Sequence, residues 1–310
     1  MSTNESTKPD TLLRVDRDRE PRDAFDEDVT GLQLVNPRAV EFMKLSRRVC
    51  LIRRERGADA TGFLVGPDLM LTSAHALLGT STIFADPDDV TVLFDQFVWN
   101  RKTGTRATGD SCRLRHIPFT NQPDVVASSI KVTARCKRRL DDNELDYILV
   151  RLDRPIGLSF LPYSNRIRGW NNCSRADVPA TGRVFVAQHP RGEDLQFADG
   201  YIPADHSVPD YPHLFSYRTT TLNGSSGAPV YDQYRRVVGV HIGERSQSQQ
   251  LGVSFQLIFE DLERERVKLP PFRLEKEVMD SIFGSSVVER GRHSGNDWRG
   301  DRLFDDIPYD

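Results

Sequence analysis

The chain has 310 residues, of which 38% are hydrophobic and 28% charged, and its formal net charge is −3. These values are ordinary for a soluble globular protein and leave room for one large or two small domains. A nucleic-acid or anionic-membrane binder needs a concentrated positive field, which this balance lacks, and no apolar run approaches the roughly 18 residues of a membrane helix. We therefore expect neither nucleic acid nor membrane as a partner.

The N-terminal sequence MSTNESTKPD is polar and holds no apolar stretch for a signal peptide. The four cysteines, Cys50, Cys112, Cys136 and Cys173, are widely spaced and form no C-x-x-C pair, so we interpret them as reduced thiols rather than a disulfide frame or a zinc site. Cys112 and His116 stand four residues apart, but no third ligand is near, and we expect no metal and no cofactor. These features predict a cytoplasmic protein.

Residues 1–32 mix acidic and basic side chains with almost no apolar periodicity, which predicts a flexible charged arm. Residues 36–49 (NPRAVEFMKLSRRV) begin with an N-cap-like Asn and a Pro and have apolar residues at helical spacing, so they predict a helix. The following two hundred residues are dominated by short segments rich in β-branched and aromatic residues, among them ATGFLVG, LMLTSA, DVTVLF, DYILVRL, RVFVAQ, APVYD and RVVGVHIG.

About a dozen short strands without intervening helices predict an antiparallel barrel or sandwich. Residues 257–267 (LIFEDLERERV) carry an apolar stripe and predict a closing helix. The basic run KLSRRVCLIRRER raises a nucleic-acid alternative. Its charges flank an alternating strand and face Asp and Glu residues nearby, so we favour a solvated face.

Three polar residues stand beside these strands. Ser226 lies in a turn bracketed by Gly224 and Gly227, which is typical either of a surface hairpin or of a nucleophile held on a bend with backbone N–H groups facing an oxyanion. His75 follows an apolar strand, where a lone histidine is more often structural. Asp146 heads the apolar run DYILVRL, where a carboxylate needs a partner unless it caps a turn.

In chain order these residues are His75, Asp146 and Ser226, an order that serine peptidase triads use. A serine hydroxyl attacks only when a base takes its proton, and the base needs a carboxylate to fix its tautomer. The alternative G-x-S-x-G elbow does not fit, because Ala228 stands at its last position and no helical pattern follows.

The segments GFLVGPDLMLTSAHA, LDYILVRL and GSSGAPVYD with RVVGVHIG resemble the His, Asp and Ser blocks of the trypsin-like (chymotrypsin-fold) serine peptidases. The similarity covers about residues 45–265 and is closest to bacterial intracellular-type trypsin-like peptidase domains and glutamyl endopeptidases. It implies an all-β fold of two six-stranded antiparallel barrels with a C-terminal helix. The protease domain would span residues 33–267, with the barrels divided near residues 155–180, and residues 268–310 would form a charged, loosely ordered tail.

The resemblance also implies roles for individual residues: His75 as base, Asp146 as its orienting group, Ser226 as nucleophile, and the amides of Gly224 and Ser226 as the oxyanion hole. Three departures stand out. The stretch from residue 89 to residue 146 is longer than a minimal first barrel needs. Ser225 replaces the Asp of zymogen-activated relatives, and Ala76 replaces a disulfide cysteine of secreted relatives.

Two residues suggest which side chain is accepted before the scissile bond: Thr221, five residues before Ser226, and His241, fifteen residues after it. Glutamyl endopeptidases resemble the chain at both positions, and a hydroxyl and an imidazole can both donate to a substrate carboxylate. The alternative is that His241 is a buried strand histidine. Glu244 would repel an acidic substrate unless it points outward or pairs with Arg245.

These observations predict a serine endopeptidase that acts on protein or peptide substrates and prefers Glu, then Asp, before the scissile bond. The resemblance also suggests an activating partner protein in a larger regulated bacterial system. The alternative is a catalytically silent trypsin-like fold that serves as a protein-binding module.

Overall fold

The structure is a computed structural model that describes residues 37–78, 84–96, 98–100, 105–106, 109–129, 145–161, 166–173, 177–209, 211–246 and 249–270. The chain divides into two units, Met1–Glu41 and Phe42–Asp310. The described residues of the first unit form the beginning of helix α2 (Pro37–Ser46). The predicted arm at residues 1–32 and most of the predicted tail lie outside the described residues.

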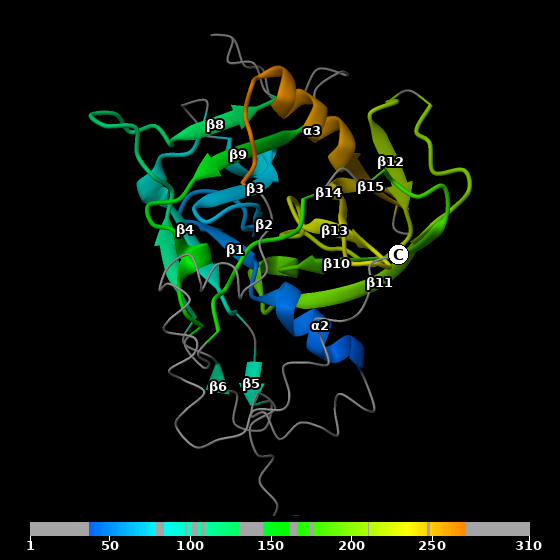
Figure 1. The fold of residues 1–310 in the computed structure, drawn as a ribbon, viewed down its shortest axis with the longest axis horizontal. Coiled ribbons are helices and arrows are strands. Elements are labelled where there is room, and N and C mark those ends of the chain that lie inside the picture. Colours follow the sequence, from blue (N-terminus) through cyan, green and yellow to red (C-terminus); the bar gives the residue numbers. More distant parts are fainter. Residues whose placement is uncertain are drawn as a thin grey trace, which may run out of the picture. The chain divides into compact units, whose positions relative to one another are not determined.

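The second unit contains two antiparallel sheets. The first holds seven strand segments in the order β7-β4-β1-β2-β3-β9-β8 (Figure 1). Their bounds are β1 (Val49–Arg54), β2 (Ala60–Leu64), β3 (Leu69–Ser73), β4 (Val90–Phe94), β7 (Ser111–Arg113), β8 (Val125–Ser128) and β9 (Tyr147–Arg151). A separate pair, β5 (Val98–Asn100) and β6 (Thr105–Arg106), lies within the long stretch that precedes Asp146. Short 3-10 helices follow β3 and precede β4: η1 (Ala74–Leu77) and η2 (Pro87–Asp89).

The second sheet holds six strands in the order β11-β10-β13-β14-β15-β12. Their bounds are β10 (Gly182–Gln188), β11 (Gln196–Ile202), β12 (Leu214–Tyr217), β13 (Pro229–Asp232), β14 (Val237–Ser246) and β15 (Gln249–Ser254). The 3-10 helix η3 (Ile156–Leu158) lies between the sheets in sequence, η4 (Pro190–Gly192) follows β10, and helix α3 (Phe255–Arg264) follows β15.

The central strands of the first sheet are buried on both faces, because successive side chains enter different apolar clusters. On β3, Met70 lies in a cluster that joins the first sheet to Ile156 and Trp170, whereas Leu71 lies in one that also contains Phe185 and Tyr231 of the second sheet. The second cluster therefore joins the two sheets through side-chain packing. This double burial explains the continuous apolar runs of the sequence in the segments that form β2, β3 and β9.

The predicted all-β fold of the chymotrypsin type with a C-terminal helix is confirmed. The first sheet has seven strand segments rather than six, because the short strands β7 and β8 occupy its two edges. The alternating pattern predicted for the basic run is wrong: residues 49–52 of β1 are all buried, and Arg53 and Arg54 at its end are the residues that reach the surface. No helix in the described part of the chain is long and apolar enough to cross a membrane.

Candidate active site

Ser226 lies in a tight turn that packs against the first sheet. The glycines on either side of it, Gly224 and Gly227, have φ values of +95° and +85°, in the left-handed region that favours glycine. A Cβ atom on Gly227 would collide with Thr72 Oγ1 and with the carbonyl oxygen of Thr61. Both backbone conformation and close packing therefore require the G-S-S-G pattern, and the turn is not a free surface hairpin.

Thr61 on β2 ties this turn to the first sheet. Its N–H donates to the Ser226 carbonyl at 2.9 Å, and its hydroxyl donates to the Gly224 carbonyl at 2.8 Å. The same hydroxyl accepts a hydrogen bond of 2.9 Å from the His189 N–H. With their carbonyls held in this way, the N–H groups of Gly224 and Ser226 donate to no acceptor among the described residues. Two unpaired donors in one turn are what an oxyanion hole requires.

His75 and Asp146 form a direct pair where β3 ends and the neighbouring strand β9 begins. His75 Nδ1 and Asp146 Oδ2 are 2.6 Å apart, and the His75 N–H donates to Asp146 Oδ1 at 3.0 Å. Asp146 also accepts a backbone hydrogen bond from Ala74 at 3.2 Å. The Asp146 side chain is 3% exposed and that of His75 is 35% exposed. The carboxylate is therefore shielded, while the imidazole reaches solvent.

The electrostatics of this pair favour a protonated imidazole. Burial lowers the pKa of His75, but the hydrogen bond and negative charge of Asp146 outweigh burial and hold that pKa above its ordinary value. A carboxylate on Nδ1 also places the lone pair of the neutral ring on Nε2, where a base is needed.

The fold brings the Ser226 turn close to this pair. The Ser73 backbone nitrogen, two residues before His75, lies 2.9 Å from an ideal Cβ position on Gly227. The Gly227 N–H donates to the His241 carbonyl at 2.7 Å, and the charge of His75 contributes to the low pKa of His241. Among the described residues, no hydrogen bond joins the Ser226 hydroxyl to the His75 ring.

Thr221 and His241 both lie in a buried polar cluster of the second sheet. Tyr217 Oη is 2.7 Å from His241 Nδ1, and Thr221 Oγ1 donates to Gln250 Oε1. Strand register places Gln250 opposite Tyr217 on β12. The cluster therefore joins residues of β12, β14 and β15 with the segment that leads to Ser226. Glu244, which could have repelled an acidic substrate, is exposed.

His241 is neutral in this environment. Burial lowers its pKa to about 3, helped by the positive charge of His75, while a hydrogen bond with the Leu251 backbone opposes the shift. Burial also raises the pKa of Tyr217, so its hydroxyl stays protonated. If Tyr217 donates to Nδ1, the single ring proton of His241 lies on Nε2.

The cluster includes two residues, Tyr217 and Gln250, that the sequence did not single out. No sequence signal marks them, because their contacts with His241 and Thr221 depend on strand register. Cys112 and His116 do not come together as a pair of ligands: Cys112 is buried in the core, and His116 lies 3.2 Å from Asp88. The described residues hold no group of three or more metal-ligating side chains.

Comparison with known proteins places the chain in a family. The sequence profile of the trypsin-like peptidase domain matches residues 60–240, which is more than half of the chain. The chain belongs to this family and is a serine endopeptidase of the trypsin-like class. A search of curated proteins found no match.

Two solved structures illustrate the likeness in fold. A Glu endopeptidase in complex with MPD has a TM-score of 0.51 and 16% identity, over 71% of this chain and 90% of that one. The active form of the Rv3671c protease from M. tuberculosis has a TM-score of 0.47 and 17% identity, over 78% of this chain and 89% of that one. At such identities the first likeness supports the chymotrypsin-like arrangement of the two sheets and nothing finer.

Proposed function

We propose that this endopeptidase works through a catalytic triad of Ser226, His75 and Asp146. The observation that carries the proposal is the 2.6 Å contact between His75 Nδ1 and Asp146 Oδ2, formed close to a glycine-bracketed turn with two unpaired N–H groups. A buried carboxylate on one imidazole nitrogen orients the ring and leaves the other nitrogen free to take a proton.

In this proposal Ser226 Oγ attacks the carbonyl carbon of the scissile bond while His75 Nε2 takes the hydroxyl proton. Asp146 stabilises the imidazolium, and the N–H groups of Gly224 and Ser226 donate to the oxyanion. The imidazolium then gives its proton to the departing amine, which leaves an acyl-enzyme ester on Ser226. A water molecule, deprotonated by His75, attacks that ester and restores the serine hydroxyl.

We further propose a preference for Glu, then Asp, before the scissile bond. Thr221, His241 and Gln250 line a polar cluster in which a buried charge would find several hydrogen-bond donors. A substrate carboxylate is a stronger acceptor for the His241 proton than the Leu251 carbonyl, because its oxygens are charged. The amide nitrogen of Gln250 offers two more donors, since its oxygen is already engaged by Thr221.

The triad is tested by comparing turnover of a peptide library by the wild-type protein and two serine variants. Ser226→Ala should abolish cleavage, whereas Ser207→Ala, which changes an exposed serine outside the site, should leave it unchanged. Cleavage that persists in Ser226→Ala would contradict the assignment. Absence of turnover in all three proteins, with partner binding unaffected by Ser226→Ala, would instead favour the silent binding module.

A further inference from the structure

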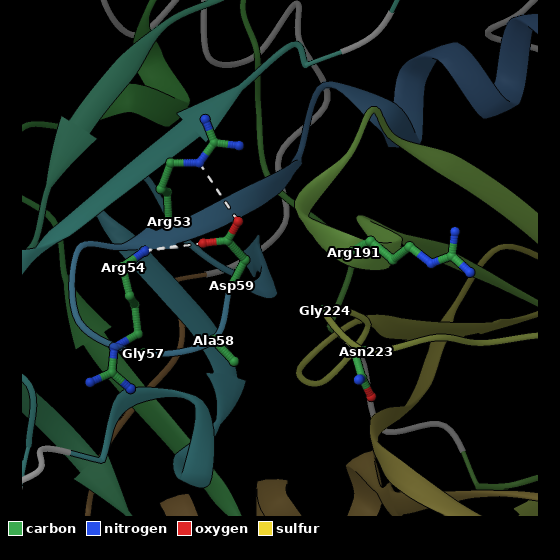
Figure 2. Close-up of a pocket in the computed structure, with 8 residues that line it drawn as sticks. All are labelled: Arg53, Arg54, Gly57, Ala58, Asp59, Arg191, Asn223 and Gly224. Atoms are coloured by element: carbon green, nitrogen blue, oxygen red, sulfur yellow. Dashed lines mark hydrogen bonds and ion pairs between the residues drawn. The ribbon is translucent and has the colours of Figure 1, made fainter.

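A pocket borders the nucleophile turn and shares no residue with the Thr221 cluster. It has a volume of about 460 Å³ and lies between the β1–β2 hairpin of the first sheet and two turns of the second sheet (Figure 2). The side chains of Arg53, Arg54 and Asp59 line it from the hairpin, and Arg191 and Gly224 line it from the opposite wall. Gly224 provides one of the proposed oxyanion donors, so the pocket opens beside the reacting carbonyl group.

The charges around this pocket are unbalanced, with three guanidinium groups and one carboxylate among the lining residues. Asp59 is already engaged: Oδ2 lies 3.7 Å from Arg53 Nε, and Oδ1 accepts a 3.3 Å hydrogen bond from the Arg54 N–H. Arg53 also donates to the Gly192 carbonyl at 3.1 Å. Arg191 is exposed and points away from the hairpin in Figure 2, so it adds positive charge at the rim.

Arg54 is the one of these cations whose guanidinium is partly buried at the base of the hairpin wall. Its Nη1 donates to the Ala76 carbonyl at 3.1 Å, which places the guanidinium beside the residue that follows His75. Its Nε is buried without a hydrogen-bond partner, and no carboxylate of the described residues lies within 4.0 Å of the guanidinium. Burial lowers the pKa of Arg54, and the negative charge of Asp89, which lies 4.0 Å from Arg56, opposes this shift only in part.

The position of this pocket along a substrate follows from the proposed function, on which the inference rests. The residue before the scissile bond would occupy the Thr221 cluster, and the departing amine must lie beside His75 to receive its proton. The chain after the scissile bond would therefore leave past Gly224 and Arg54. We propose that this pocket binds an acidic side chain one or two residues after the scissile bond, with Arg54 as the specificity-determining contact.

The test uses peptides that share the same residues before the scissile bond. They differ only in carrying Glu or Gln at the first or the second position after that bond. For wild type, kcat/KM should favour Glu by about five- to tenfold at one of these positions, as expected for a partly desolvated charge pair. Arg54→Gln should remove the preference, and Arg54→Lys should keep part of it. Arg183→Gln, on the exposed start of β10, is the matched control and should retain the full ratio.

A chromogenic anilide, which has no amino acid after the scissile bond, separates this inference from the proposed function. Failure of wild type to cleave the anilide would contradict the proposed function itself. The assignment of this pocket would be overturned if wild type cleaves the anilide but shows no preference for Glu over Gln in the peptides. It would also be overturned if Arg54→Gln lowers kcat/KM equally for the Glu and the Gln peptide. The wild-type ratio should also shrink in about 1 M salt, where charge pairs are screened, and this measurement needs no variant.

Discussion

The Tyr147 hydroxyl donates a 2.6 Å hydrogen bond to Asp261 Oδ2 and so joins the residue after Asp146 to helix α3. Asp146 has a φ of +45°, a left-handed conformation that costs a non-glycine residue on the order of 1 kcal/mol and persists only where neighbours hold it. The Tyr147 N–H is held as well, by Ser129 Oγ at 3.2 Å. We infer that Tyr147 is a positioning residue for the carboxylate of Asp146.

Tyr147→Phe should lower kcat several-fold with little change in KM, because Asp146 would hold the His75 ring less firmly. It should also lower the free energy of unfolding by about 1 kcal/mol, the usual loss for one hydrogen bond. Tyr234→Phe, which changes an exposed tyrosine, is the control. The pH profile of kcat separates positioning from a purely structural role: an unchanged profile and kcat in a destabilised Tyr147→Phe protein would contradict positioning.

The pH dependence of activity should report His75. Its pKa is raised above the ordinary value by Asp146, against the effect of burial, and a base must be neutral to accept a proton. Activity should therefore fall as the pH drops through a value above about 6.5. Asp146→Asn should move the pKa of His75 downward and cut kcat by about 10⁴-fold, because the imidazolium loses its partner. Titration of the His75 ring by NMR checks both shifts.

Acid should destabilise the fold through two buried histidines. Burial lowers the pKa of His189 to about 4 and that of His241 to about 3. Both stay neutral in the folded chain, whereas the unfolded chain binds their protons below about pH 6.5. Stability is therefore lost as the pH falls from about 6.5 toward 4, by up to about 1.4 kcal/mol per pH unit for each histidine. The raised pKa of His75 acts in the opposite sense, and its stabilising effect is fully present below about pH 6.5.

Denaturant unfolding between pH 6.5 and 5 measures this slope. His189→Asn keeps a donor for the Glu193 carbonyl, which His189 Nδ1 contacts at 2.9 Å, but removes the titrating ring. The variant should lose about half of the slope. An unchanged slope in the variant would show that the pKa of His189 is not lowered in the folded chain, and would contradict this prediction.

The preference for Glu over Gln that we propose for the Thr221 cluster should be reversed by one added negative charge. His241→Ala should lower kcat/KM for a Glu substrate by about ten- to a hundredfold more than for the matched Gln substrate, the value of one desolvated charge-assisted hydrogen bond. The Gln250→Glu variant should cleave the Gln substrate better than the Glu substrate, because it places a second carboxylate beside Thr221, where the Glu side chain of the substrate would bind. Equal losses for both substrates in His241→Ala would mean that the histidine only shapes the pocket.

The sequence predicts the fold because each strand of the two sheets is a short apolar run between turn residues. Gly224 and Gly227 mark a tight turn at Ser226, but the turn alone fits a surface hairpin equally well. His75 and Asp146 are polar residues beside apolar strands, and only their order with Ser226 and the resemblance to trypsin-like peptidases assign them roles. The contact between their side chains is a property of the β3–β9 pairing and had to be observed.

What the sequence could not provide depends on packing between distant elements. Gln250 meets Thr221 across the second sheet, and nothing in its own neighbourhood marks it as part of a cluster. The sequence predicts only that Arg54 belongs to a solvated basic face. Its contact with Ala76 joins the end of β1 to η1, which follows β3 of the same sheet, and its place opposite Gly224 follows from how the β1–β2 hairpin packs against turns of the second sheet.

The central claim is that Ser226 is a nucleophile activated by His75. It is tested most directly by treating the wild-type protein with a fluorophosphonate, which reacts with activated serines, and mapping the adduct by peptide mass spectrometry. The account predicts one adduct, on Ser226, that disappears in Ser226→Ala and forms at least a hundredfold more slowly in His75→Ala. An adduct on another serine, or labelling at an unchanged rate in His75→Ala, would contradict it.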